Sequence, residues 1–185
     1  MEKKLILDET QLSTQQVFCG ELLDVRKDHV RLPNGNSAVR EYILHPGAVV
    51  IIAKFDDQRI IMERQHRYPL GRDFIELPAG KIDKGEEPLA AAQRELREET
   101  GYSAQHWREL GLIHPCVGYA NEVMTLYLAT GLAWQGGEAD ADECLEIFTL
   151  PLAEALQAVK SGRITDAKSV IGLFWAEKLA LGKWA

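Results

Sequence analysis

The sequence predicts a mixed α/β (α+β) protein, in which a run of strands is followed by a helix, more strands and two further helices. Two observations carry this prediction. Short strand-like runs separated by turn residues fill the first half of the chain, and helical patterns occur over residues 87–100 and after residue 150. Because strands and helices do not alternate regularly, a simple series of parallel strand–helix–strand units is not favoured. The 185 residues suffice for one domain with a core, with or without a small appendage.

Residues 17–45 have the pattern of short strands separated by turns. The stretch "LPNGN" at 32–36 is a strong turn signal, because it places Pro33 and an Asn-Gly pair between two strand-like runs. The Pro-Gly pair at 46–47 then interrupts the chain. We therefore expect a small N-terminal antiparallel β subdomain over residues 1–45 and a larger domain over residues 46–185.

The run "AVVIIAKF" at 48–55 is continuous and rich in β-branched residues, as in a strand buried on both faces. The "DDQ" stretch at 56–58 is expected to turn this run into the next strand, at 59–68, as a hairpin. A short strand, "FIELPAG" at 74–80, ends at a Pro-Ala-Gly turn. Further strands are expected at about 108–114, 123–130 and 143–149.

Residues 87–100 have the features of a helix. Pro88 suits the first turn, the alanines at 90–92 favour helix, and Gly101 stands where a helix would end. Two more helices are expected in the C-terminal part, over "PLAEALQAVKSG" at 151–162 and "DAKSVIGLFWAEKLALG" at 166–182.

The composition argues against several classes of protein. A formal net charge of −7 disfavours a general nucleic-acid or membrane-surface binder, since both partners are anionic. No stretch approaches the roughly 18 apolar residues of a membrane span. The cysteines, Cys19, Cys116 and Cys144, have no CxxC spacing, so neither a disulfide framework nor a thiolate zinc site is implied, and a reducing cytoplasm is expected. A small anionic substrate is compatible with this charge where a metal ion or arginines screen it.

Glu95, Glu98 and Glu99 occupy one turn of the predicted helix. Residues three and four apart are neighbours on a helix, so these like charges repel one another. Hard divalent cations such as Mg²⁺ bind a few carboxylates together with water and substrate phosphates. The cluster is therefore a candidate metal site, with a solvated helix face as the alternative. Arg94 can reach either Glu98 or Glu86, and both contacts would be structural.

The helix and its flanks resemble the Nudix box, the signature of the Nudix hydrolases. The resemblance rests on Gly80, then five residues, Glu86, then seven residues and "RELREETGY" at 94–102. The one departure is Tyr102, where the pattern usually has an aliphatic residue. The resemblance favours the metal site over the solvated face, and it implies a Nudix-type mixed sheet between helices.

The resemblance also implies a set of ligands. Glu95 and Glu99 are expected to be the principal metal ligands, with Glu98 contributing to a further ion and to catalysis. The backbone carbonyl of Ala79 would be another ligand. Two or three Mg²⁺ ions, or Mn²⁺, are expected at each site. 

Other residues of the box are expected to shape the site. A side chain at Gly80 would crowd the metal and the bound diphosphate. Glu86 and Arg94 are expected to brace the loop against the helix, and Gly101 to end the helix.

Several segments resemble the ADP-ribose pyrophosphatase branch of the family. They are "LPNG" at 32–35, "REYILHPGAVVII" at 40–52, "QHRYPLG" at 65–71, "ELPAGKID" at 76–83 and "GRITDAKSVIGLFW" at 162–175. Val117 departs from the branch, which usually has a proline there, whereas Gly118 and Glu122 keep their places. The implied reaction is metal-dependent hydrolysis of ADP-ribose to AMP and ribose 5-phosphate. The alternatives are another nucleoside diphosphate derivative (a sugar nucleotide, NADH or a dinucleoside polyphosphate) and a non-catalytic Nudix-fold ligand sensor.

Glu122 is the candidate general base. It lies on a glycine-containing loop, as the catalytic glutamate of the resembling branch does, and a mobile loop can bring a carboxylate to a water molecule. Glu143 is a second candidate, and a solvated loop glutamate is the alternative for both. His45, His66 and His114 are scattered along the sequence, and none is expected to be a ligand.

The remaining candidates concern the substrate. Arg40 and Arg67 could bind the diphosphate, because guanidinium groups bind phosphates as a fork, and Glu76 could accept hydrogen bonds from ribose hydroxyls. A surface ion pair is the alternative for each. Phe18 and Tyr68 could stack on adenine or belong to the core. Since the N-terminal strands are too short to be stable alone, and similar segments in the branch cross a two-fold axis, we expect a homodimer in which they contribute to the partner's pocket.

Overall fold

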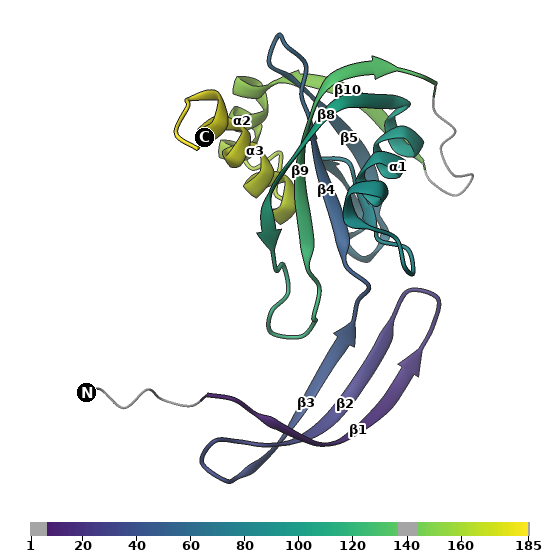
Figure 1. The fold of residues 1–185 in the computed structure, drawn as a ribbon, viewed down its shortest axis with the longest axis vertical. Coiled ribbons are helices and arrows are strands. Elements are labelled where there is room, and N and C mark those ends of the chain that lie inside the picture. Colours follow the sequence, from purple (N-terminus) through teal and green to yellow (C-terminus); the bar gives the residue numbers. More distant parts are fainter. Residues whose placement is uncertain (1–6, 137–143, 185) are drawn as a thin grey trace. The chain divides into compact units, whose positions relative to one another are not determined.

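The computed structural model describes residues 7–136 and 144–184, which divide into two compact units (Figure 1). The first unit comprises the chain up to His45 together with residues 116–122, and the second comprises residues 46–115 and the chain from residue 123 onward. The N-terminal part of the first unit ends at His45. Residues 116–122 belong to the first unit, although the sequence pattern had assigned them to the larger domain.

The first unit is built on a three-stranded antiparallel sheet. Its strands, in spatial order, are β1 (Thr10–Cys19), β2 (Asp24–Arg31) and β3 (Ser37–Leu44). The turn between β2 and β3 is the expected one: Gly35 has a φ of +87°, which suits glycine, and its N–H donates to the Leu32 carbonyl at 2.9 Å. β1 begins seven residues before the strand-like pattern at residue 17. All ten of its residues are exposed, so burial imposes no alternation of apolar and polar positions that would indicate the strand in the sequence.

Residues 116–122 join this sheet through the end of β3. The N–H of Ile43 donates to the Tyr119 carbonyl at 2.9 Å, and the N–H of Asn121 donates to the Ile43 carbonyl at 3.3 Å. These two bonds form a short parallel bridge between Ile43 and Ala120. The loop is therefore held by backbone contacts to the N-terminal strands.

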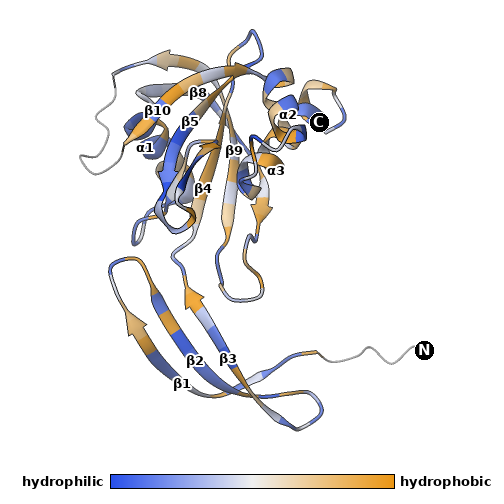
Figure 2. Cartoon of the chain, turned by 180° about the vertical axis from the view of Figure 1, so that it is seen from behind, coloured by the Kyte–Doolittle hydropathy of each residue, from blue (hydrophilic) through white to orange (hydrophobic). Residues whose placement is uncertain are grey.

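The second unit is organised around strand β4 (Ala48–Ala53), which is buried along its whole length and hydrophobic (Figure 2). It lies in a four-stranded sheet of order β7-β4-β9-β8. β4 pairs in parallel with β9 (Met124–Trp134) and antiparallel with β7 (Ala79–Lys81), while β8 (Tyr102–Ile113) pairs with β9. The predicted strand buried on both faces is thus confirmed.

A second sheet has the order β10-β5-β6, with β5 (Arg59–Arg67), β6 (Arg72–Glu76) and β10 (Leu145–Pro151). The expected hairpin is wrong beyond its turn. Lys54 and Ile60 form one isolated bridge, after which β4 and β5 enter different sheets. The physical reason is that a strand has only two edges: those of β4 are taken by β7 and β9, and those of β5 by β10 and β6.

Three helices cover the faces of β4, namely α1 (Pro88–Thr100), α2 (Leu152–Lys160) and α3 (Ala167–Ala180). One face of β4 packs against Ala92 and Leu96 of α1, and the other packs against Leu173 of α3. Figure 1 shows α1 on one side of β4 and β9, and α2 and α3 on the other. The expected mixed sheet between helices is confirmed. Among the residues described, no helix combines the length and apolar character that crossing a membrane would require.

Candidate functional site

Helix α1 begins and ends where the sequence predicted. Pro88 occupies its first turn, where a missing N–H costs no hydrogen bond. Gly101 has a φ of +74°, and its N–H donates to the Arg97 carbonyl at 2.9 Å, which closes the helix. These two ends place Glu95, Glu98 and Glu99 on the last two turns of the helix.

Arg94 contacts both of the partners that its position allowed. Its Nε and Nη2 donate to the two carboxylate oxygens of Glu86 at 3.0 and 2.9 Å, and Nη1 donates to Glu95 at 2.8 Å and to Glu98 at 3.0 Å. Nη2 also donates to the Lys81 carbonyl at 3.0 Å. The hydrogen bonds with Glu86 raise the pKa of Arg94 and lower the pKa of Glu86. One permanently charged guanidinium therefore ties the loop to the helix.

Gly80 and Ala79 of β7 lie directly against the carboxylates of α1. The N–H of Ala79 donates to Oε2 of the buried Glu99 at 3.1 Å. A β-carbon at Gly80 would come within 1.9–2.4 Å of the carboxylate atoms of Glu95, so any side chain there would displace that carboxylate. The absence of a side chain at Gly80 leaves the space that Glu95 occupies.

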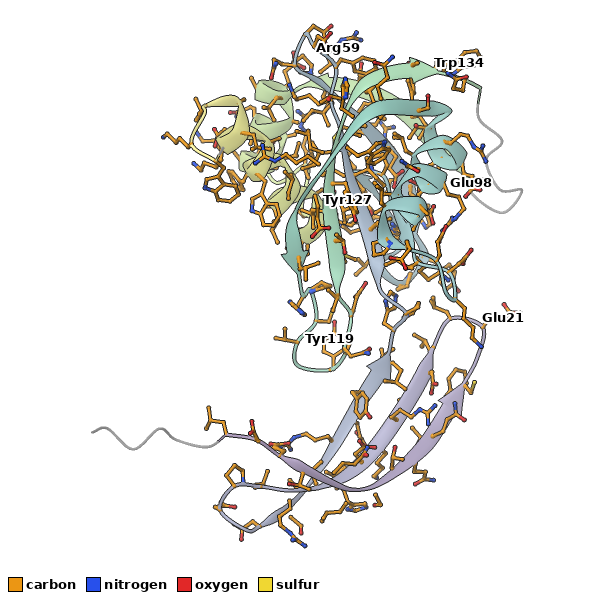
Figure 3. The ribbon with its side chains drawn as sticks, in the orientation of Figure 1. Glu21, Arg59, Glu98, Tyr119, Tyr127 and Trp134 are labelled. Atoms are coloured by element: carbon orange, nitrogen blue, oxygen red, sulfur yellow. The ribbon has the colours of Figure 1, made fainter. Side chains whose placement is uncertain are left out.

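The oxygen atoms gathered here suit a hard divalent cation. The Glu99 carboxylate accepts the Ala79 N–H, and the Glu95 carboxylate lies against Gly80. Glu98 (Figure 3) shares Nη1 of Arg94 with Glu95. Carboxylates and carbonyls are the ligands that Mg²⁺ prefers. Within residues 7–136 and 144–184, no three His, Cys, Asp or Glu side chains converge closely enough to hold a metal as they stand. In this arrangement Nη1 of Arg94 bonds to both Glu95 and Glu98. The donor set fits the cation, and Arg94 stabilises the present arrangement.

Glu122 lies at the end of the 116–122 loop, in the first unit. Its Oε1 is 3.8 Å from Nε2 of His45, and both side chains are mostly buried. The N–H of His45 also donates to Oδ1 of Asn121 at 2.7 Å. Sequence reasoning missed His45 and Asn121, because nothing in the sequence indicates that position 45 meets the loop. Glu143, the second candidate base, lies outside the described residues.

Two further features belong to the same loop. Tyr119 (Figure 3) accepts a hydrogen bond on its hydroxyl from the Cys116 thiol at 3.1 Å. Val117 is 81% exposed, so the departure from the resembling branch falls on the loop surface. The valine therefore replaces proline without disturbing a packed core.

Arg67 and Glu76 bond to each other in a bidentate pair, with Nε–Oε1 and Nη2–Oε2 distances of 2.8 and 2.7 Å. Glu76 is only 2% exposed, and its Oε2 also contacts Nζ of Lys168. Burial raises the pKa of Glu76, but the hydrogen bonds from Arg67 and the charge of Lys168 outweigh it and hold the pKa below its usual value. Glu76 is thus an ionised internal partner of two cations, and Arg67 is the member of the pair that reaches the surface.

Arg40 lies on β3 in the first unit and pairs with Glu9 through both carboxylate oxygens. It borders a hollow of about 320 Å³ that Asp28, Tyr42 and residues 117–121 also line. Oδ2 of the buried Asp28 accepts a hydrogen bond from the Tyr42 hydroxyl at 3.0 Å. The hollow thus combines a guanidinium, a carboxylate and aromatic surface within one unit.

The remaining sequence candidates lie on the surface or pair locally. Phe18 is 56% exposed and Tyr68 is 89% exposed, so neither belongs to the core. Nδ1 of His66 is 2.8 Å from Oδ1 of Asp73 on the neighbouring strand. The rings of Phe18 and Tyr68 are therefore accessible to a ligand.

Comparison with known proteins extends over nearly the whole chain. The family model of the NUDIX domain matches residues 44–170, and that of the nucleoside diphosphate sugar hydrolase N-terminal domain matches residues 9–43. The methanol dehydrogenase activator of Bacillus methanolicus is 41% identical over 170 residues, which is 91% of this chain and 92% of that protein. The ADP-ribose pyrophosphatase of Bacillus subtilis (strain 168) is 40% identical over 169 residues, or 90% of this chain and 91% of that protein.

A solved structure, described as an ADP compounds hydrolase, has the same fold. It superposes with a TM-score of 0.87 and 27% sequence identity, and the match covers 98% of each chain. The family model, the 40% identity and this superposition agree with the box at residues 80–102 and with the mixed sheet between helices. The chain belongs to the Nudix family.

Proposed function

We propose that this chain hydrolyses the diphosphate bond of ADP-ribose, with a divalent cation, to give AMP and ribose 5-phosphate. The observation that carries the proposal is the set of oxygen donors on α1 and β7, where the lack of a side chain at Gly80 leaves room for the Glu95 carboxylate. The name and 40% identity of the Bacillus subtilis relative support ADP-ribose as the substrate.

Glu95, Glu98, Glu99 and the carbonyl of Ala79 would hold two or three Mg²⁺ or Mn²⁺ ions. When bound, such ions supply positive charge against the diphosphate and make water more acidic. To reach them, Glu95 and Glu98 would give up their hydrogen bonds with Nη1 of Arg94. Arg94 would keep its bidentate contact with Glu86, so the loop would stay attached to the helix.

Glu122 would accept the proton of the attacking water, and Glu98 would assist. The support for Glu122 is its mostly buried carboxylate, 3.8 Å from His45, on a loop that backbone bonds hold to β3. A base must be held within reach of the proton that it abstracts, and these contacts limit its freedom. 

Arg67 and Arg40 would contact the substrate. Arg67 is oriented by Glu76, so the buried carboxylate would act on the diphosphate through that arginine. Arg40 borders the hollow in the first unit, where the Asp28 carboxylate is suited to the hydroxyl or amino groups of a nucleoside. Phe18 and Tyr68 are exposed and could stack on a base.

The protein would act as a homodimer in the cytoplasm. The β1-β2-β3 sheet exposes apolar side chains, among them Leu12, Val17 and Val39, and β1 is exposed on both faces. A second copy of the chain would cover them, and the N-terminal strands would then contribute to the partner's pocket. Three free cysteines suit a reducing compartment.

A sugar nucleotide is the second candidate substrate, because residues 9–43 match the N-terminal domain of nucleoside diphosphate sugar hydrolases. A hydrolysis screen with Mg²⁺ over ADP-ribose, NADH, sugar nucleotides and dinucleoside polyphosphates tests both. ADP-ribose should give the highest kcat/KM, with AMP as a product. A higher value for a sugar nucleotide would replace the proposed substrate, and no hydrolysis at all would indicate a ligand sensor.

Replacing Glu99 by glutamine should abolish most activity. The loss should exceed the about 10- to 100-fold that outer-shell partners of a metal cost, because a direct ligand is changed. Glutamine keeps an oxygen for the Ala79 N–H, so the thermal midpoint should change little. Glu146→Gln, which loses only its ion pair with Arg64, is the matched control. Activity near the wild-type level in Glu99→Gln would contradict the ligand assignment.

Replacing Glu122 by glutamine should lower kcat by about 10²- to 10⁴-fold, the range of a positioned general base. KM should move little, because metal ions and arginines would hold the diphosphate. Steady-state kinetics at saturating Mg²⁺ measure both, and Glu21→Gln in the same unit, an exposed position (Figure 3), serves as the control. A sharp rise in KM at constant kcat would make Glu122 a binding residue.

Light scattering at micromolar concentration should give about twice the 20.7 kDa of one chain. Val17→Glu should shift the protein toward the monomer and reduce activity together, because a charge would enter the apolar surface of β1. A wild-type monomer with full activity would rule out the shared pocket.

A further inference from the structure

The first turn of α3 carries a compact polar cluster centred on Asp166. Oδ2 of Asp166 accepts hydrogen bonds from the Ser169 N–H at 3.0 Å, the Ser169 hydroxyl at 2.6 Å and Nζ of Lys168 at 3.0 Å. The first of these bonds caps the helix, since it satisfies an N–H that has no partner within the helix. Ser169 and Lys168 are buried, so the cluster is part of the interior of the second unit.

This cluster holds the segment that leads into Ala79. A serine hydroxyl has one proton, and that of Ser169 goes to Asp166, so its oxygen is left to accept the buried Leu77 N–H at 2.7 Å. Lys168 in turn bonds to the carboxylate of Glu76. Two successive residues of the segment are thus each bound by a residue of the first turn of α3.

Close packing reinforces the hydrogen bonds. A β-carbon at Gly172 would lie 2.5 Å from Cδ1 of Leu77 and 3.5 Å from a side-chain carbon of Ile52. The backbone of α3 therefore packs closely against the side chain of Leu77, which is itself fully buried. A displacement of α3 at this point would move Leu77 with it.

The contacts continue without a break to the candidate metal site. The Pro78 carbonyl accepts from the Ile51 N–H at 2.8 Å, and the Ala79 N–H donates to Glu99 at 3.1 Å. Ala79 then begins β7, where it pairs with Val50 of β4. Every residue from 76 to 79 is therefore bonded to another part of the second unit. The Ala79 carbonyl lies two residues along the chain from Leu77, which bonds to Ser169 of α3.

From these contacts we infer that Asp166, Lys168 and Ser169 are positioning residues, which fix the backbone of Ala79 for cation binding. The inference rests on the proposed role of Ala79 as a ligand. Stability alone does not account for the cluster, because replacing a buried ion pair by apolar residues of similar size is often neutral or stabilising. What the cluster does provide is a fixed position for the backbone that leads from Glu76 to Ala79.

The test is cation binding without substrate. Mn²⁺ is titrated into Ser169→Ala, and the free ion is measured by electron paramagnetic resonance. Without the hydroxyl the Leu77 N–H loses its acceptor, so Mn²⁺ affinity should fall by about 10-fold, the lower end of the effect of outer-shell partners. The matched control is Ala155→Gly, which weakens the buried face of α2 in the same core. It should keep wild-type affinity at a comparable loss of thermal midpoint.

Lys168→Met provides a second variant should Ser169→Ala not fold. It removes the charge that bonds to Glu76 and keeps an unbranched side chain, and Mn²⁺ affinity should again fall. Wild-type Mn²⁺ affinity in both variants, or a loss as large in Ala155→Gly, would overturn the inference, as would a wild-type protein that binds no Mn²⁺. The titration contains no ADP-ribose, so a chain that binds Mn²⁺ but leaves ADP-ribose intact would fail the proposed function and still test this one.

Discussion

Glu95 on α1 lies so close to Gly80 on β7 that a β-carbon at position 80 would come within 1.9–2.4 Å of its carboxylate. This approach constrains the whole second unit. β7 is only three residues long and is held at its distance by pairing with β4, which is buried on both faces. α1 is held by its apolar face against the same strand. The site thus depends on the fact that one strand positions both a helix and its neighbouring strand.

Charge balance follows from the same arrangement. Packing α1 against β7 places several glutamates where water cannot fully solvate them, and an unpaired buried charge is costly. Arg94 compensates the negative charge of Glu86, Glu95 and Glu98 with a single guanidinium, because its planar fork can bond to more than one carboxylate at once. At the other end of the segment 76–81, Glu76 is balanced by Arg67 and Lys168. The backbone of this segment therefore lies between two sets of ion pairs.

The first unit has a different physical character. Its β1 strand buries none of its residues, and the sheet keeps apolar side chains on its surface. The loop that carries Glu122 is bound to this sheet through Ile43. The base candidate and the hollow beside Arg40 therefore both belong to the unit with the smaller core, whereas the candidate metal ligands belong to the larger one.

The sequence by itself determined the local features of this protein. Pro88 and Gly101 marked the ends of α1, the run at 48–55 marked a strand buried on both faces, and the spacing of Glu95, Glu98 and Glu99 put them together at the end of the helix, because each of these depends on neighbours within a few residues. The Asn-Gly turn before β3 belongs to the same class.

Tertiary structure alone decided which distant segments meet. It sent β4 and β5 into different sheets, placed His45 beside Glu122, and made Glu76, a candidate for binding ribose hydroxyls, a buried partner of Lys168. None of these contacts produces a helical or strand periodicity in the sequence. Each joins two residues that are far apart in the chain, and the residues next to them have other partners. What the local pattern cannot encode is the pairing of edges and of buried charges, which depends on all the strands and helices competing for the same partners.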